Sequence, residues 1–161
     1  MKTYLERINE QTPTRMWVNN PTPSEAKKGL EAGTFGATSN PTYLSHMLKA
    51  EETKDAALSA IDRYVRMTED DHLVVALAYQ EMIAKIAEIF LPLFQETGGE
   101  KGWVAIQGNP YRDDDIDFIL QEAHRFYEIS HNIVVKVSAT LAGIAAMEKL
   151  TSEGRCVLAT A

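Results

Sequence analysis

The chain has 161 residues, of which 45% are hydrophobic and 24% are charged, which suits one globular domain with a core of ordinary size. Its formal net charge is -7 and no run of Lys or Arg stands out, so we expect neither a nucleic acid nor an anionic membrane surface as a partner. The charged start lacks the apolar segment of a signal peptide, and no stretch approaches the roughly 18 apolar residues of a membrane span. We therefore expect a cytoplasmic protein.

The single cysteine, Cys156, excludes an intrachain disulfide and a cysteine-based zinc site. Because Cys156 stands beside two apolar residues, Val157 and Leu158, we expect it to be buried as a small hydrophobic side chain. The four histidines show no ligand spacing, and we expect no metal and no cofactor: His46, His72, His124 and His131.

Helical and short apolar segments alternate along the chain with little spare loop. The segment TPSE (residues 22–25) is a capping box with proline at the first helical position, and Asn40-Pro41 repeats this order. Gly33 should end the first of these helices, and Pro92 should end the longest helix of the chain. In chain order the predicted elements are helix 4–10, strand 16–18, helix 23–32, strand 35–39, helices 40–49, 54–67 and 71–91, strand 103–106, helix 116–127, strand 133–137, helix 140–152 and strand 156–158.

Strands that alternate with helices predict β/α units and a parallel sheet, hence the α/β class. Such a sheet is either an open doubly wound layer or a closed eight-stranded barrel of the TIM type. The open sheet fits the length, whereas a barrel needs about 200 residues or more, so five strands would form an incomplete barrel. In both architectures the functional groups lie at the carboxyl ends of the strands.

Lys136 interrupts the segment IVVKVS (residues 133–138), which otherwise is typical of a strand buried on both faces. Burial of a lysine lowers its pKa, and a neutral amine is the nucleophile that attacks carbonyl carbons to form a Schiff base. The alternative is a structural lysine, whose stem packs while its ammonium reaches the strand end, or which protects an exposed edge.

Polar residues also stand at the ends of the other predicted strands. They are Asn19, Asn40, Gln107 and Thr160. Four polar groups at equivalent strand ends are unusual as core residues, and they point to a site. For each one taken singly, the alternative is a cap of the following helix, above all for Asn40, which Pro41 follows.

Two segments resemble signatures of the transaldolase family. ATSNPTYL (residues 37–44) is similar to the family's second-strand signature, and VVKVSAT (residues 134–140) is similar to its Schiff-base strand. GIAA (residues 143–146), Leu150 and Glu153-Gly154 continue the second match. The resemblance covers residues 15–161, weakly over 50–100, and the spacing of the two segments suits the longer transaldolases.

The resemblance implies an eight-stranded α/β barrel that moves a three-carbon dihydroxyacetone unit between sugar phosphates, as in the pentose phosphate pathway. Lys136 would form the Schiff base, and Asn40 would hydrogen-bond the bound three-carbon unit. Thr160 stands where the family has a threonine that helps hold a catalytic water. Thr38 and Ser138, which belong to the two matching segments, are expected to contact the substrate.

The departures from the family pattern concern proton transfer. The first-strand aspartate of the family is Asn19 here (Asn20 if the match shifts by one residue), and its third-strand glutamate is Gln107. A fifth-strand asparagine corresponds to Leu158. An amide keeps the size of a carboxylate but exchanges no proton at neutral pH, and loss of a positioned acid or base lowers a rate by about 10²–10⁴-fold. The nearest carboxylate after the third strand, Asp113, stands about two turns of chain too far along.

The length is the second departure. Residues 1–161 are interpreted as a single partial barrel domain that holds five of eight strands. The last three strands of the family, which carry its phosphate-binding arginine and serine, are not represented. Open sheet edges and an exposed apolar interior would drive such a chain to aggregate or to associate as a homo-oligomer, so we expect the sequence to be a fragment or a truncated product. The alternative is a natural half-barrel.

Three functional hypotheses follow. The first is a transaldolase-like transferase with altered or weak activity, which acts through Lys136. The second is a catalytically silent relative that binds a sugar phosphate or a protein partner. The third is an open-sheet domain with a separate binding role, in which Lys136 is structural.

Overall fold

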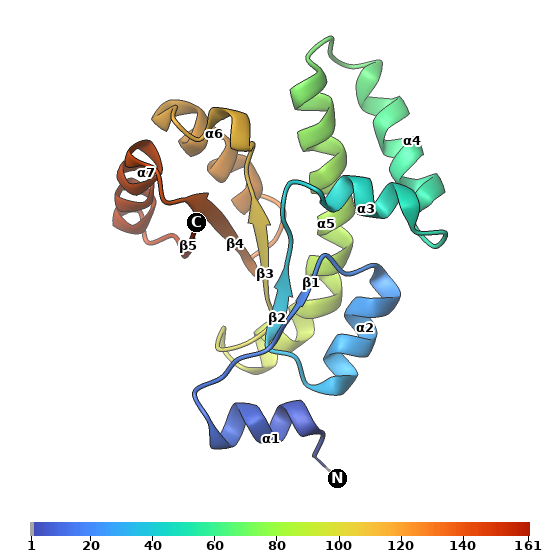
Figure 1. Cartoon of the computed structure of the whole chain (residues 1–161), viewed down its shortest axis with the longest axis vertical. Coiled ribbons are helices and arrows are strands. Elements are labelled where there is room, and N and C mark those ends of the chain that lie inside the picture. Colours follow the sequence, from blue (N-terminus) through green and yellow to red (C-terminus); the bar gives the residue numbers. More distant parts are fainter. Residues whose placement is uncertain (1) are drawn as a thin grey trace.

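The computed structural model describes residues 2–161 and contains one sheet of five parallel strands in the order β1-β2-β3-β4-β5 (Figure 1). The strands are β1 (Trp17–Asn19), β2 (Gly36–Thr38), β3 (Trp103–Gln107), β4 (Ile133–Ser138) and β5 (Val157–Thr160). Each strand pairs with the next one along the chain. A doubly wound sheet reverses its strand order at a switch point, whereas this sheet does not. The chain therefore forms five consecutive strands of a TIM-type barrel.

The helices lie where the sequence predicts them, with shifts at their ends. They are α1 (Tyr4–Gln11), α2 (Pro23–Ala32), α3 (Tyr43–Lys49), α4 (Lys54–Val65), α5 (Asp71–Glu96), η1 (Pro110–Arg112), α6 (Ile116–Tyr127) and α7 (Leu141–Ser152). α3, α4 and the first half of α5 extend beyond the carboxyl ends of the strands, and α1 lies at the opposite end of the sheet (Figure 1). Within residues 2–161 no helix combines the length and apolarity that a bilayer crossing requires.

The prediction that Pro92 ends the longest helix is wrong, because α5 continues through Pro92 to Glu96. Proline removes one helical hydrogen bond, but the flanking turns are fixed by tertiary packing. Phe90 is fully buried, and the ring of Phe94 packs edge-on against Trp103 with 4.7 Å between the centroids. These contacts hold the backbone helical until the glycines that follow Thr97.

One face of the sheet packs against the helices and forms the main core. Its strand residues are between 0% and 4% exposed: Ala37, Val104, Ile106, Ile133, Val135 and Val137. Because side chains alternate along a strand, the residues between these point to the opposite face. On that face Ala105 and Val134 are buried, and Leu158 is the large apolar strand residue that is exposed. Trp17 and Trp103 lie on the same face and are half-buried, so this face keeps apolar area beside the polar strand ends.

The expected burial of Cys156 is also wrong, since its side chain is exposed. Cys156 immediately precedes β5, which is the last strand of the sheet in residues 2–161. β5 pairs with β4 on one side, and no described strand pairs with its other side.

Candidate functional site

Six of the predicted site residues lie on the face of the sheet opposite the helices. The register pairs Asn19 with Thr38, Gln107 with Lys136, and Ser138 with Thr160. The alternation of side chains gives all six the same orientation relative to the sheet. Apart from the Lys136 amine, none of these side chains has a hydrogen-bond partner within residues 2–161, so they are available to a ligand.

The Lys136 amine donates a hydrogen bond to the main-chain carbonyl of Ser39 at 3.2 Å. No carboxylate of residues 2–161 lies within ion-pair distance of this amine. Partial burial without a counter-ion disfavours the ammonium form and lowers the pKa of Lys136 below its ordinary value. A lowered pKa increases the unprotonated fraction of the amine, and the unprotonated amine is the form that attacks a carbonyl carbon.

A buried network that the sequence analysis did not predict fixes the acceptor of this hydrogen bond. The Ser39 hydroxyl donates to the Ala105 carbonyl at 2.7 Å and contacts the Tyr79 hydroxyl at 2.6 Å. The Gln107 main-chain N–H donates to the same Tyr79 hydroxyl at 3.3 Å. The network therefore ties the ends of β2 and β3 together beside Lys136. A buried tyrosine on a helix carries no sequence signal that distinguishes it from an ordinary core residue.

The alternative interpretation of Asn40 as the cap of the following helix is wrong, because α3 begins at Tyr43 with Thr42 as its N-cap and has no side-chain capping hydrogen bond. Asn40 instead closes the turn before α3. Its side-chain oxygen accepts hydrogen bonds from the Thr42 main-chain N–H at 3.0 Å and from the Thr42 hydroxyl at 2.6 Å. The main-chain N–H of Asn40 donates to the side-chain oxygen of Asn20 at 3.1 Å, and Asn20 has a left-handed backbone with φ 48°. The Asn40 side-chain nitrogen has no partner within residues 2–161, so a second role as a donor to a ligand remains a prediction.

Asn19 and Gln107 differ in their surroundings. Asn19 ends β1 with an exposed side chain, whereas Gln107 is half-buried and pairs directly with Lys136 across β3 and β4. Leu158 pairs with Lys136 from the other side, on β5. The two neighbours of the lysine in the sheet are thus an amide and an apolar side chain, and neither supplies a proton.

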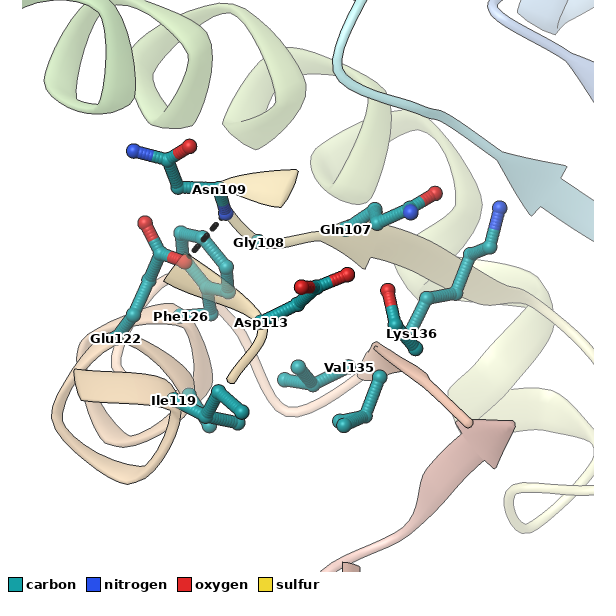
Figure 2. Close-up of a pocket in the computed structure, with 12 residues that line it drawn as sticks. Gln107, Gly108, Asn109, Asp113, Ile119, Glu122, Phe126, Val135 and Lys136 are labelled. Atoms are coloured by element: carbon teal, nitrogen blue, oxygen red, sulfur yellow. Dashed lines mark hydrogen bonds between the residues drawn. The ribbon is translucent and has the colours of Figure 1, made fainter. Parts of the chain in front are cut away.

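A small cavity beside Lys136 contains a carboxylate that the sequence analysis judged too distant. The cavity lies between the ends of β3 and β4 and helix α6, and its volume is about 20 Å³ (Figure 2). Gln107, Asp113, Lys136 and Ser138 are among its lining residues, together with the helix-facing Val135 and Val137 and residues of α6. Asn109 caps the short helix η1 and turns the chain back, because its side-chain oxygen accepts from the Tyr111 N–H at 3.0 Å. The distance along the chain was therefore a poor guide to the distance in space.

The position of Asp113 is also fixed from the loop after β4. The Thr140 hydroxyl donates to the Asp113 main-chain carbonyl at 2.6 Å and also caps α7 by accepting from the Gly143 N–H at 2.9 Å. A Cβ at residue 143 would collide with the Ser138 carbonyl, so glycine allows the first turn of α7 to approach β4. The loops after β3 and β4 are held together by these contacts.

A second cavity of about 470 Å³ adjoins the first, between α3, α5 and the loop after β3. Tyr79, Gln107 and Glu122 are among its lining residues, and Glu122 also lines the smaller cavity. The Glu122 carboxylate accepts from the Asn109 main-chain N–H at 2.7 Å, and burial raises the pKa of Glu122 above its ordinary value. Within residues 2–161 no three His, Cys, Asp or Glu side chains are grouped as metal ligands.

Comparison with known proteins identifies the family. The family model described as Transaldolase/Fructose-6-phosphate aldolase matches residues 17–161. The chain belongs to this family. The match includes the lysine-bearing strand β4 and the ends of all five strands, and it agrees with the sequential strand order of the sheet. Both the family resemblance of the sequence and the partial TIM-type barrel are confirmed.

Individual transaldolases are similar to the chain at moderate identity. The transaldolase of Neisseria meningitidis serogroup C (strain 053442) is 30% identical over 155 residues, which cover 87% of this chain and 41% of the relative. The transaldolase of Campylobacter jejuni (strain RM1221) is 31% identical over 134 residues, or 81% of this chain and 39% of the relative. That of Trichodesmium erythraeum (strain IMS101) is 27% identical over 130 residues. The chain thus spans about two fifths of the length of the first two relatives.

Proposed function

We propose that the chain transfers a three-carbon dihydroxyacetone unit between sugar phosphates through a Schiff base on Lys136. The observation that carries the proposal is the partly buried Lys136 amine, which has a lowered pKa, a main-chain carbonyl as its hydrogen-bond partner and no carboxylate at ion-pair distance within residues 2–161. Membership of the transaldolase family supports this chemistry for the lysine of β4.

The reaction begins when the unprotonated Lys136 amine attacks the carbonyl carbon of a ketose phosphate, and loss of water gives an iminium. The bond between the third and fourth carbons then breaks. Its electron pair moves to the iminium nitrogen to form an enamine, while the hydroxyl on the fourth carbon loses its proton and leaves as an aldehyde. The enamine next attacks an acceptor aldehyde, whose oxygen takes up a proton, and water hydrolyses the new iminium to free the amine.

The remaining predicted residues would bind and orient the sugar. Thr38 and Ser138 present hydroxyl groups on the same face as the Lys136 amine. Asn40 directly follows Ser39, whose main-chain carbonyl accepts the hydrogen bond from that amine. Thr160, paired with Ser138, is proposed to hold the water that hydrolyses the iminium. Asn19 and Gln107 supply hydrogen bonds but no proton exchange, so slow turnover is expected.

Reduction with borohydride in the presence of fructose 6-phosphate tests the proposal, because borohydride converts the iminium into a stable amine. Mass spectrometry should find the adduct on the peptide that contains Lys136 and none on the peptide of the exposed Lys149. The variants Lys136→Met and Lys136→Arg should give no adduct. Absence of any adduct on Lys136 in the folded wild-type chain would refute the proposal.

The second candidate is a silent relative that binds a sugar phosphate without turning it over. The observation in its favour is that Asn19 and Gln107 occupy both positions where the family has carboxylates. The variant Asn19→Asp with Gln107→Glu separates the candidates. If cleavage appears only in this variant, the native chain is the silent form; if the wild type already cleaves the ketose, it is an enzyme.

A further inference from the structure

The small cavity beside Lys136 contains two carboxylates in a chain that lacks both carboxylates of the family pattern. Asp113 and Glu122 are the acidic residues that line it. Cleavage of the bond between the third and fourth carbons requires an acceptor for the hydroxyl proton, and the amides of Asn19 and Gln107 cannot serve. Asp113 and Glu122 are therefore the two candidates in this cavity for the proton acceptor that Asn19 and Gln107 cannot provide.

Glu122 is already engaged and points away from the amine. One of its oxygens accepts from the Asn109 main-chain N–H at 2.7 Å, and the other lies 3.5 Å from a guanidinium nitrogen of Arg125. Figure 2 shows the Glu122 carboxylate directed toward Asn109, on the far side of the cavity from Lys136. The Glu122 carboxylate therefore holds the loop after β3 in place through its hydrogen bond with Asn109.

Asp113 has the opposite arrangement. Its carboxylate is half-buried, has no hydrogen-bond or ion-pair partner within residues 2–161, and is directed toward the side of the cavity where Gln107 and Lys136 lie (Figure 2). Its main chain is held by the Thr140 hydroxyl, so the side chain is presented from a fixed loop. A carboxylate that has no partner and lines the same cavity as the lysine is available for proton transfer through a water molecule.

We propose that Asp113 is the catalytic proton acceptor for carbon–carbon cleavage in this chain, a role for which the family uses other positions. The inference rests on the proposed Schiff-base function of Lys136. When the bond between the third and fourth carbons breaks, its electron pair enters the iminium and forms the enamine. The proton of the hydroxyl on the fourth carbon passes to a water molecule, and that water gives a proton to the Asp113 carboxylate. The cavity volume of about 20 Å³ accommodates one such water.

In the transfer direction the same groups act in reverse. The enamine carbon attacks the acceptor aldehyde, and the protonated Asp113 returns its proton through the water to the new hydroxyl. Asp113 is thus ionised before each cleavage and after each transfer, and no co-reactant is consumed. A general base can work through one water, and a positioned base contributes about 10²–10⁴-fold to a rate.

The test compares Asp113→Asn with Asp114→Asn, a matched change at the next residue, which is exposed and lines neither cavity. Each variant is incubated with fructose 6-phosphate, reduced with borohydride at a series of times and analysed by mass spectrometry. A six-carbon phosphorylated adduct on Lys136 reports the iminium before cleavage, and a three-carbon adduct reports cleavage. The two steps are therefore read separately in one experiment.

Wild type and Asp114→Asn should accumulate the three-carbon adduct. Asp113→Asn should form the six-carbon adduct normally and the three-carbon adduct at least about 10²-fold more slowly. Added formate should restore the three-carbon adduct in Asp113→Ala, where it can occupy the place of the missing carboxylate.

Three results would overturn the proposal. Formation of the three-carbon adduct at the wild-type rate in Asp113→Asn would show that another group takes the proton. Loss of both adducts in that variant would contradict a role confined to cleavage, because the iminium should still form. Absence of every adduct in the wild type would instead refute the Schiff-base function of Lys136, and this inference with it.

Discussion

The amine of Lys136 donates to the main-chain carbonyl of Ser39, which is 97 residues earlier in the chain, at 3.2 Å. This hydrogen bond joins β4 to the end of β2, directly before Asn40, so the two segments that carry the family resemblance meet at one point of the fold. A main-chain carbonyl neutralises no charge. The amine is thereby held in place without the counter-ion that would keep it protonated.

The pH dependence of Schiff-base formation should report the lowered pKa of Lys136. Burial lowers this pKa below the ordinary value of 10.5, so the unprotonated fraction at neutral pH is larger than for an exposed lysine. The rate of adduct formation should rise with pH and level off below pH 10.5. The measurement is the rate of borohydride-trapped adduct against pH, with a free lysine derivative as the reference. A rate that still rises beyond pH 10.5 would contradict the prediction.

Lys136→Met should increase the free energy of unfolding at pH 7. The lowered pKa means that the folded state binds fewer protons than the unfolded state between the folded pKa and 10.5, so wild-type stability rises with pH across that window. Methionine keeps much of the stem and removes the buried charge. Urea unfolding should therefore show an advantage of the variant at pH 7 that shrinks as the pH approaches 10.5. An advantage independent of pH would show that packing, and not charge, is responsible.

Tyr79→Phe should destabilise the fold and slow adduct formation together. Tyr79 is buried, and its hydroxyl contacts the Ser39 hydroxyl and accepts from the Gln107 N–H. Loss of a buried hydrogen-bonding group costs about 1–3 kcal/mol. The control is Tyr127→Phe, whose hydroxyl donates to the Cys156 carbonyl at 2.7 Å near the open edge. Equal effects of the two variants on the rate of trapping would argue against a positioning role for Tyr79.

Glu122→Gln should flatten the dependence of stability on pH above the ordinary pKa of 4.5. Burial raises the pKa of Glu122, so the folded state binds more protons than the unfolded state in the window from 4.5 to the raised value. This contribution is present at low pH and is lost as the pH rises through that window. Glutamine stays neutral and keeps an acceptor for the Asn109 N–H, so the variant should be at least as stable as wild type at pH 7. Urea unfolding at pH 4 and pH 7 measures the difference.

Glu122→Ala provides the contrast, because it removes the acceptor altogether. The Asn109 N–H would be left without its partner, and stability should fall by about 1–3 kcal/mol. If glutamine and alanine destabilise the chain equally, the hydrogen bond to Asn109 is not what the carboxylate contributes.

Asn19→Asp should rescue an Asp113→Asn variant. Asn19 ends β1 on the face that carries Lys136, and an aspartate there restores the carboxylate of the family pattern. The rate of three-carbon adduct formation should rise by about 10²-fold or more in the Asp113→Asn background and by less in the wild type, where Asp113 already accepts the proton. Equal gains in both backgrounds would show that the two positions serve different steps.

The local pattern of the sequence was sufficient to predict the elements that depend on nearby residues. The capping box before α2 and the glycine at its end lie where predicted, since a cap satisfies main-chain groups within one turn. The five strands also form within one or two residues of their predicted ends. Short apolar segments between helices become buried by pairing side by side as strands of a sheet that the helices cover. The parallel β/α class followed from their alternation.

The tertiary structure decided what depends on groups far apart in the chain. Packing of Phe90 and Phe94 carries α5 past Pro92, and Cys156, directly before β5, is exposed. Only the folded loops bring Asp113 to the cavity of Lys136, through hydrogen bonds at Asn109 and Thr140. The sequence by itself singled out Lys136 as the candidate nucleophile, because a lysine within a buried strand is costly wherever the strand lies. Which carboxylate lines the cavity of Lys136 depends on how two loops fold back, and no local pattern records that.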